Sequence, residues 1–145
     1  MSTERQIQIT AGDVTVIASL NDSPTADALW EALPVSASGQ TWGDEIYFGI
    51  PVEAENDDYA EETVEMGAIA YWPPGSALCL FFGPTPMSAP GEIRPASAVN
   101  VLGQMVALSE STRSILMLFV SFTCWVVEQA VAVISVITVS TRLER

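Results

Sequence analysis

The chain has 145 residues, with 18 acidic and 5 basic side chains, no histidine and a formal net charge of −13. This length predicts one domain with a single core. The charge excludes a general nucleic-acid surface, because phosphate binding relies on Lys and Arg. The lack of histidine excludes Ser-His and Cys-His catalytic pairs within the chain. So acidic a composition predicts a protein that works in high salt, where repulsion between surface charges is screened.

The first predicted elements are a β-hairpin and a short helix. Gln6–Thr10 and Val14–Leu20 largely alternate apolar with polar or small residues around a Gly-Asp turn, which is typical of two antiparallel strands. Ser23 followed by Pro24 predicts the N-terminus of a helix over about residues 24–33. A proline directly after this segment ends the helix.

The middle of the chain predicts further short strands separated by Gly and Pro. These prolines and glycines favour tight turns, since Pro fixes φ and Gly accepts positive φ. Many short strands with one helix are typical of a barrel or a sandwich. The predicted strands are Ile46–Phe48, Ala68–Trp72, Leu78–Phe82 and Val99–Val106.

Three of these segments and the helix carry a family resemblance. Gly43–Val52, Tyr71–Pro86 and Pro95–Gly103 are its strongest pieces, in this order along the chain. Over about residues 6–106 the chain resembles the small cyclophilin-like domains of bacteria and archaea. The resemblance implies a mainly β fold, a closed β-barrel with one short capping helix. It does not imply isomerase activity, because members of this small family generally depart from the isomerase active-site pattern.

The composition changes near residue 106. All nine Gly and all nine Pro lie at or before Gly103, and the tail that follows is strongly apolar. We therefore predict two parts, a barrel domain over residues 1–106 and a C-terminal tail over residues 107–145.

The tail admits three interpretations. Ile115–Val139, apolar except around Glu128 and Gln129, is long enough to cross a bilayer as a helix. Alternatively, Val131–Val139, which is rich in β-branched residues, and Ile115–Phe122 form strands that complete the barrel. The third interpretation is an aberrant extension that replaces a closing strand. The N-terminus lacks a secretory signal, so we expect a cytoplasmic protein, or one anchored to a membrane by this tail.

No cofactor, metal site or catalytic residue is predicted. The two cysteines are far apart and histidine is absent, which leaves no zinc ligand set. The acidic run Glu53–Glu62 lacks the spacing of a calcium-binding loop, so we interpret it as a solvated loop. Asp44 and Glu45 are adjacent, so on a strand they face opposite sides and form no carboxylate pair.

Aromatic residues suggest a ligand-binding groove. We predict that Tyr47, Tyr71, Trp72, Phe82 and Arg94 form it, with polar groups supplied from adjoining loops. The function predicted is a non-catalytic binding module for a small molecule or an extended peptide. A weak peptidyl-prolyl cis-trans isomerase and a tail-anchored membrane protein are the alternatives. The candidate ligand-binding residues are Tyr47, Tyr71, Trp72, Phe82, Thr85, Arg94 and Asn100.

Overall fold

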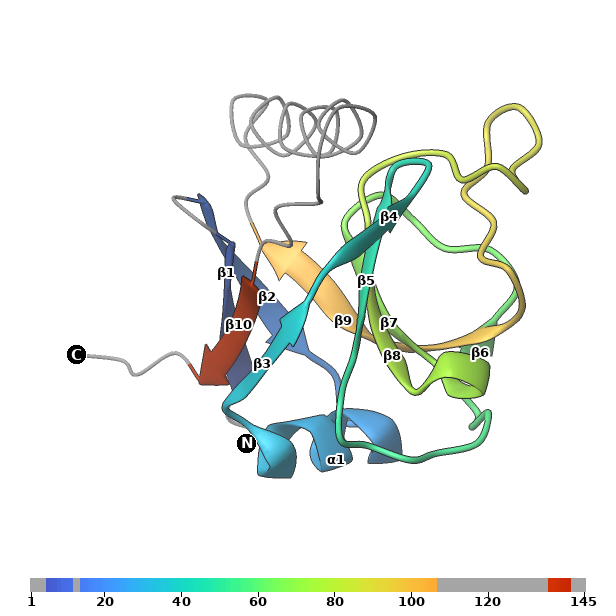
Figure 1. The fold of residues 1–145 in the computed structure, drawn as a ribbon. Coiled ribbons are helices and arrows are strands. Elements are labelled where there is room, and N and C mark those ends of the chain that lie inside the picture. Colours follow the sequence, from blue (N-terminus) through green and yellow to red (C-terminus); the bar gives the residue numbers. More distant parts are fainter. Residues whose placement is uncertain (1–4, 12–13, 107–135, 142–145) are drawn as a thin grey trace.

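The computed structural model describes residues 5–11, 14–106 and 136–141 (Figure 1). Ten strands, one α-helix and one 3-10 turn make up this part of the chain. In chain order they are β1 (Arg5–Ala11), β2 (Val14–Leu20), α1 (Pro24–Ala32), β3 (Val35–Ser38), β4 (Gln40–Trp42), β5 (Glu45–Gly49), β6 (Ala60–Glu61), β7 (Ala68–Trp72), η1 (Pro73–Gly75), β8 (Ala77–Phe81), β9 (Val99–Val106) and β10 (Val136–Thr141).

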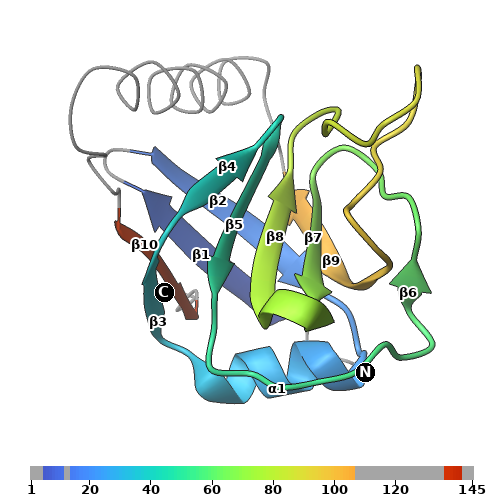
Figure 2. The ribbon, with the colours of Figure 1, turned by 45° about the vertical axis from the view of Figure 1, so that its right-hand side comes forward.

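The predicted hairpin and helix are confirmed. β1 and β2 pair antiparallel from Arg5 opposite Leu20 to Ala11 opposite Val14. Ser23 caps α1, because its Oγ accepts a hydrogen bond of 3.2 Å from the backbone N–H of Ala26. The helix lies across one end of the curved sheet (Figure 2). Its buried residues, among them Leu29, face the core of the protein.

The strands form one antiparallel sheet with the order β3-β10-β1-β2-β9-β7-β8-β5-β4. The short strand β6 pairs with β9 and lies off this path. The mainly β fold with one helix is as predicted, but the closed barrel is not confirmed. Within the described residues the hydrogen-bonded order is open and ends at β3 and β4. These two strands are consecutive in the chain and separated by Gly39. One continuous segment thus pairs first with β10 and then with β5, and among the described strands no ladder joins the two ends directly.

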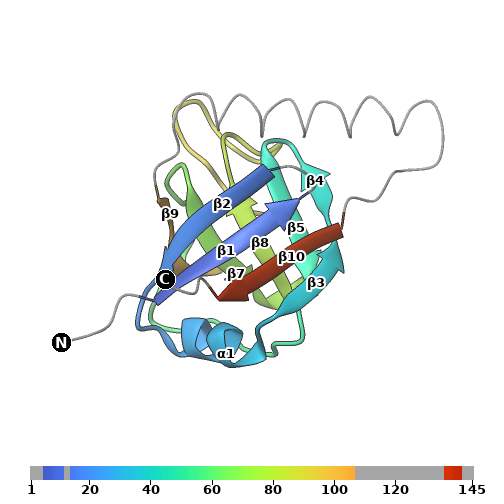
Figure 3. The same cartoon turned by 90° about the vertical axis from the view of Figure 1, so that its left-hand side faces the viewer.

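The tail contributes a strand to the sheet. β10 lies between β1 and β3 (Figure 3) and pairs antiparallel with both. Ile137 and Val139 are buried, at 2% and 0% exposure. For Val136–Thr141 the structure therefore agrees with the strand interpretation, and Val136–Val139 are not helical. Residues 115–135 of the predicted membrane helix lie outside the described residues. The boundary at residue 106 stays a prediction.

The described part of the chain contains no helix with the length and apolar character needed to cross a bilayer.

Candidate functional site

Two apolar clusters lie on opposite faces of the central strands. Neighbouring residues of a strand point to opposite faces, so Tyr71 and Trp72 belong to different clusters. The inner cluster is the main core and includes α1, both strands of the hairpin and β10. The outer cluster is smaller. It contains Ala68, Ala70, Cys79, Phe81, Ile93 and Val99, and Tyr47, Val64 and Trp72 pack against it.

This division separates the aromatic residues of the predicted groove. Tyr71 and Phe82 lie in the inner cluster at 0% and 1% exposure. The Tyr71 hydroxyl donates a 2.6 Å hydrogen bond to the carbonyl of Val52 and accepts one of 3.3 Å from the N–H of Ala54. The five residues therefore do not assemble into one groove, because the pleat of β7 turns Tyr71 into the core. Sequence alternation signals this separation, but it does not tell which face is the core.

Tyr47 and Trp72 do share the outer face, and both are half-buried. The Tyr47 hydroxyl donates to Oε1 of Gln40 at 2.9 Å. Trp72 Nε1 donates to the hydroxyl of Ser97 at 2.7 Å. The Trp72 ring also lies against Gly75, where an added Cβ would come within 2.7 Å of two ring carbons. The Pro-Pro-Gly turn thus packs closely against the Trp72 ring.

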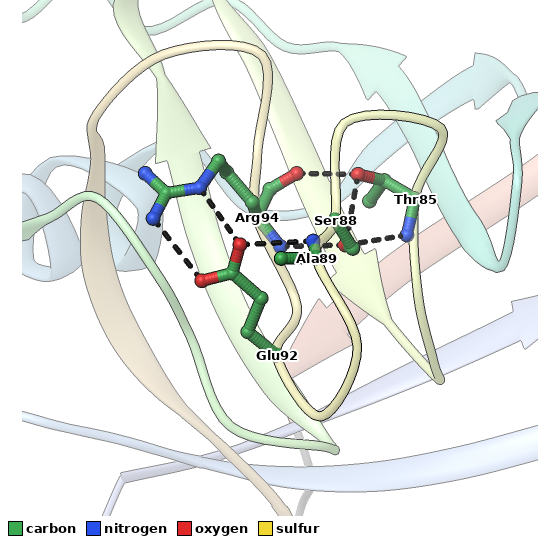
Figure 4. A network of polar contacts seen from close by, with 5 residues as sticks. All are labelled: Thr85, Ser88, Ala89, Glu92 and Arg94. Carbon is green, nitrogen blue, oxygen red and sulfur yellow. Dashed lines mark hydrogen bonds and ion pairs between the residues drawn. The ribbon is translucent and has the colours of Figure 1, made fainter.

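Thr85 and Arg94 belong to a hydrogen-bonded loop beside this face (Figure 4). The Thr85 hydroxyl donates to the carbonyl of Arg94, and the Ser88 hydroxyl accepts from the N–H groups of Thr85 and Arg94 at 3.0 and 2.9 Å. The Arg94 guanidinium contacts both carboxylate oxygens of Glu92 at 3.1 Å. The hydrogen bond from Arg94 lowers the pKa of Glu92. Because this carboxylate engages Arg94, the geometry gives no support to an isomerase role for the arginine, and that alternative stays a prediction.

Asn100 is fully buried, where β9 meets α1 and the acidic segment. Its amide Nδ2 donates to Thr25 Oγ1 at 3.2 Å and to the carbonyl of Glu55 at 2.8 Å. Its Oδ1 accepts from the N–H of Asp57 at 3.0 Å. With these bonds Asn100 connects three segments distant in sequence, and its amide is already engaged by protein groups. A contact of Asn100 with a ligand stays a prediction.

The acidic segment that follows β5 makes one hydrogen bond to α1 and one within itself through Asp57. Asp57 accepts from the hydroxyl of Thr25 at 2.8 Å and from the N–H of Tyr59 at 2.8 Å. Further along, Val64 forms an isolated antiparallel bridge with Ile93, which joins this segment to the loop of Thr85 and Arg94. Among the described residues, no group of three or more His, Cys, Asp or Glu side chains is placed to hold a metal ion.

Glu45 is a feature of the outer face that sequence reasoning missed. It lies on β5, only 6% exposed, opposite Phe81 of β8. Two residues further, Tyr47 is opposite Cys79, so all four side chains point to the same face. Burial raises the pKa of Glu45, and its hydrogen bond with the Cys79 thiol lowers it by less. Burial, with the neighbouring carboxylate, raises the pKa of Cys79 well above its ordinary value. Sequence reasoning missed Glu45 because the sequence does not show that this side chain is buried. Its burial draws attention to it, since acidic residues are rarely buried without a partner.

The burial of Glu45 predicts a pH dependence of stability. The folded protein holds the Glu45 proton more tightly than the unfolded chain, so this residue lowers stability as pH rises from about 4.5 through the folded pKa. We expect Glu45→Gln to stabilise the protein at pH 7 and to lose that advantage near pH 4. Urea unfolding at both pH values measures this difference. A variant that is equally or less stable than wild type at pH 7 would contradict the prediction.

Comparison with known proteins identifies the family of this chain. A family model described as cyclophilin-like matches residues 5–117. The chain belongs to the cyclophilin-like family. The solution structure of the hypothetical protein AF2241 from Archaeoglobus fulgidus is 33% identical, with a TM-score of 0.71, and the match covers 98% of both chains. For this cyclophilin-like protein the similarity thus continues beyond residue 106.

A second solved structure, McbB in complex with tryptophan, has a TM-score of 0.72 at 18% identity. The match covers 96% of this chain but only 45% of the McbB chain, and at this identity it indicates a common fold alone. None of the curated proteins compared matches the chain.

Proposed function

We propose that this cyclophilin-like domain is a binding module for a small molecule with an aromatic or other flat apolar group. The observation that carries the proposal is the margin of the outer cluster, where the half-buried rings of Tyr47 and Trp72 pack against buried apolar residues on the second face of the sheet. Small-molecule sites are mostly apolar, with a few polar groups that orient the ligand. Here the polar groups are Glu45 and the hydroxyl of Tyr47. The tryptophan bound by McbB, a protein of the same fold, agrees with a ligand of this class.

Thermal unfolding with and without tryptophan tests this function. A ligand that binds only the folded protein stabilises it by about 2.7 kcal/mol at one hundred times its Kd. For a domain of this size that corresponds to a rise in Tm of about 5–10 °C. We expect a saturable rise with tryptophan or a related indole in the full chain at molar salt.

Two variants locate the site. Tyr47→Ala removes an aromatic ring from the outer face and is expected to abolish the ligand-induced rise in Tm. Tyr59→Ala is the matched control, because Tyr59 is 43% exposed in the acidic segment and should leave the rise unchanged. If indoles and a broad metabolite panel produce no rise in wild type, the proposed function is wrong. If the Tyr47→Ala variant still shows the ligand-induced rise in Tm, the ligand binds at another site on the protein.

A further inference from the structure

Residues 53–62, which we call the acidic strap, pass α1 and include β6 (Figure 2). Just before the strap, Val52 is 5% exposed and belongs to the core. Just after it, Val64 forms a bridge with Ile93. Both ends of the strap are therefore fixed, and its middle is the part that can dock or detach. Six of its ten residues are acidic and none is basic: Glu53, Glu55, Asp57, Asp58, Glu61 and Glu62.

Hydrogen bonds centred on Asp57 dock the middle of the strap. Its carboxylate accepts from Thr25 Oγ1 of α1 at 2.8 Å, and its N–H donates to Asn100 Oδ1 of β9 at 3.0 Å. Two residues further, the carbonyl of Tyr59 accepts from the N–H of Val101 at 3.1 Å. Asn100 and Thr25 are 0% and 2% exposed. The docked strap thus lies directly against two buried polar side chains of the domain.

Repulsion between like charges opposes this docking. The strap brings six carboxylates close to α1, which itself carries two acidic residues and no basic one. Among the described residues the arginines are Arg5, which pairs with Asp27 at 2.6 Å, and Arg94, which pairs with Glu92 at 3.1 Å. The hydrogen bond with Glu92, and to a smaller extent the charge of Glu62, raise the pKa of Arg94. This arginine therefore offsets charge only toward the C-terminal end of the strap.

The salt concentration sets the strength of this repulsion. Exposed charges interact over about 10 Å in 0.1 M salt but over only about 3 Å in 1 M salt. The hydrogen bonds of the strap act at contact distance and are partly buried, so salt screens them much less. Rising salt therefore weakens the repulsion while the contacts that dock the strap persist.

We propose that the acidic strap is a salt-dependent element, which is docked through Asp57 in molar salt and detaches at low ionic strength while the sheet stays folded. The strap is then a local unit of lower stability than the sheet. Its detachment exposes the side chains of Thr25 and Asn100, so this polar cluster at the start of α1 becomes accessible only at low salt. The inference stands independently of the proposed binding function, since its test uses no ligand.

Hydrogen exchange of single amides tests this inference, followed by NMR on the full chain at constant pH in 0.1 M and 2 M KCl. The reporters are the N–H groups of Asp57 and Val101, because each bonds across the boundary between strap and sheet. The amide of Leu80 is the reference, since β8 lies between β5 and β7 in the sheet. We expect the protection of both reporters, relative to Leu80, to fall at least about tenfold in 0.1 M KCl. A ratio to Leu80 that is the same in both salts would overturn the inference.

Two neighbouring variants separate the docking contact from the charge. Asp57→Ala removes the carboxylate that accepts from Thr25 and Tyr59, and we expect it to leave the Val101 amide weakly protected in both salts. Asp58→Asn removes the same charge from an exposed position, and we expect it to raise the protection of Val101 in 0.1 M KCl by about twofold.

Either variant can overturn the inference. If Asp57→Ala keeps the wild-type protection of Val101 in 2 M KCl, Asp57 does not dock the strap. If Asp58→Asn leaves the protection in 0.1 M KCl unchanged or lowers it, repulsion does not drive the detachment. Should Asp57→Ala fail to fold, the salt comparison in wild type and the Asp58→Asn variant still decide the outcome.

Discussion

Gly103→Ala is expected to lower the free energy of unfolding by about 3 kcal/mol, a large effect for the addition of one methyl group. At this position β9 lies opposite Leu20 of β2, and a Cβ would come within 1.9 Å of the Ser19 carbonyl oxygen and 2.9 Å of its carbonyl carbon. The added methyl group would meet backbone atoms of β2, so no side chain can rotate away to make room for it. β2 and β9 would have to separate, with loss of ladder hydrogen bonds. Urea unfolding followed by circular dichroism measures the change.

Gly49→Ala is the matched control in a neighbouring part of the sheet. Gly49 lies on β5, and a Cβ added there would have no atom within 4 Å. We expect a change within about 0.5 kcal/mol. Equal stability of the two variants would show that the close approach of β2 and β9 does not determine stability.

Ile137→Ala is expected to destabilise the domain by about 3 kcal/mol, because it removes a buried side chain and leaves a cavity. Ile137 belongs to β10, is 2% exposed, and fills the space that Gly39 leaves open. There, an added Cβ would come within 2.4 Å of its Cδ1 atom. A residue of an independent membrane anchor would have no such effect on the unfolding of the sheet. Thermal and urea unfolding of the full chain measure the difference.

Thr138→Ala serves as its control on the same strand. Thr138 points to the other face, where its hydroxyl is 3.0 Å from that of Ser36 in an exposed pair. We expect a loss of about 0.5 kcal/mol, in the range of a weak surface hydrogen bond. If both variants unfold like wild type, β10 does not contribute to the stability of the sheet, and the strand interpretation of Val136–Thr141 would be wrong.

Only part of the candidate site is predictable from the sequence, because the face on which a side chain lies and its burial depend on distant segments. Tyr47 and Trp72 are two of the aromatic residues predicted for the groove, and the structure brings them to one face. Tyr71 is predicted for the same groove, but it is adjacent to Trp72 on β7, and a strand sends adjacent residues to opposite faces. Glu45 was considered only as a partner for Asp44. Its importance comes from burial, which depends on strands and loops far away in the sequence.

Local chemistry in the sequence by itself determined the hairpin of β1 and β2, the capped start of α1, and the central strands β5, β7, β8 and β9. Their signals are short-range, since alternation, caps and turn residues act within a few positions. β3, β4 and β6 were missed, because strands of two to four residues carry too little pattern to recognise. Only the tertiary structure decided which face of the sheet became the core, and it brought β10 between β1 and β3. Both depend on contacts between distant segments: the partner of Ile9 on one side is Val16, and on the other it is Val139.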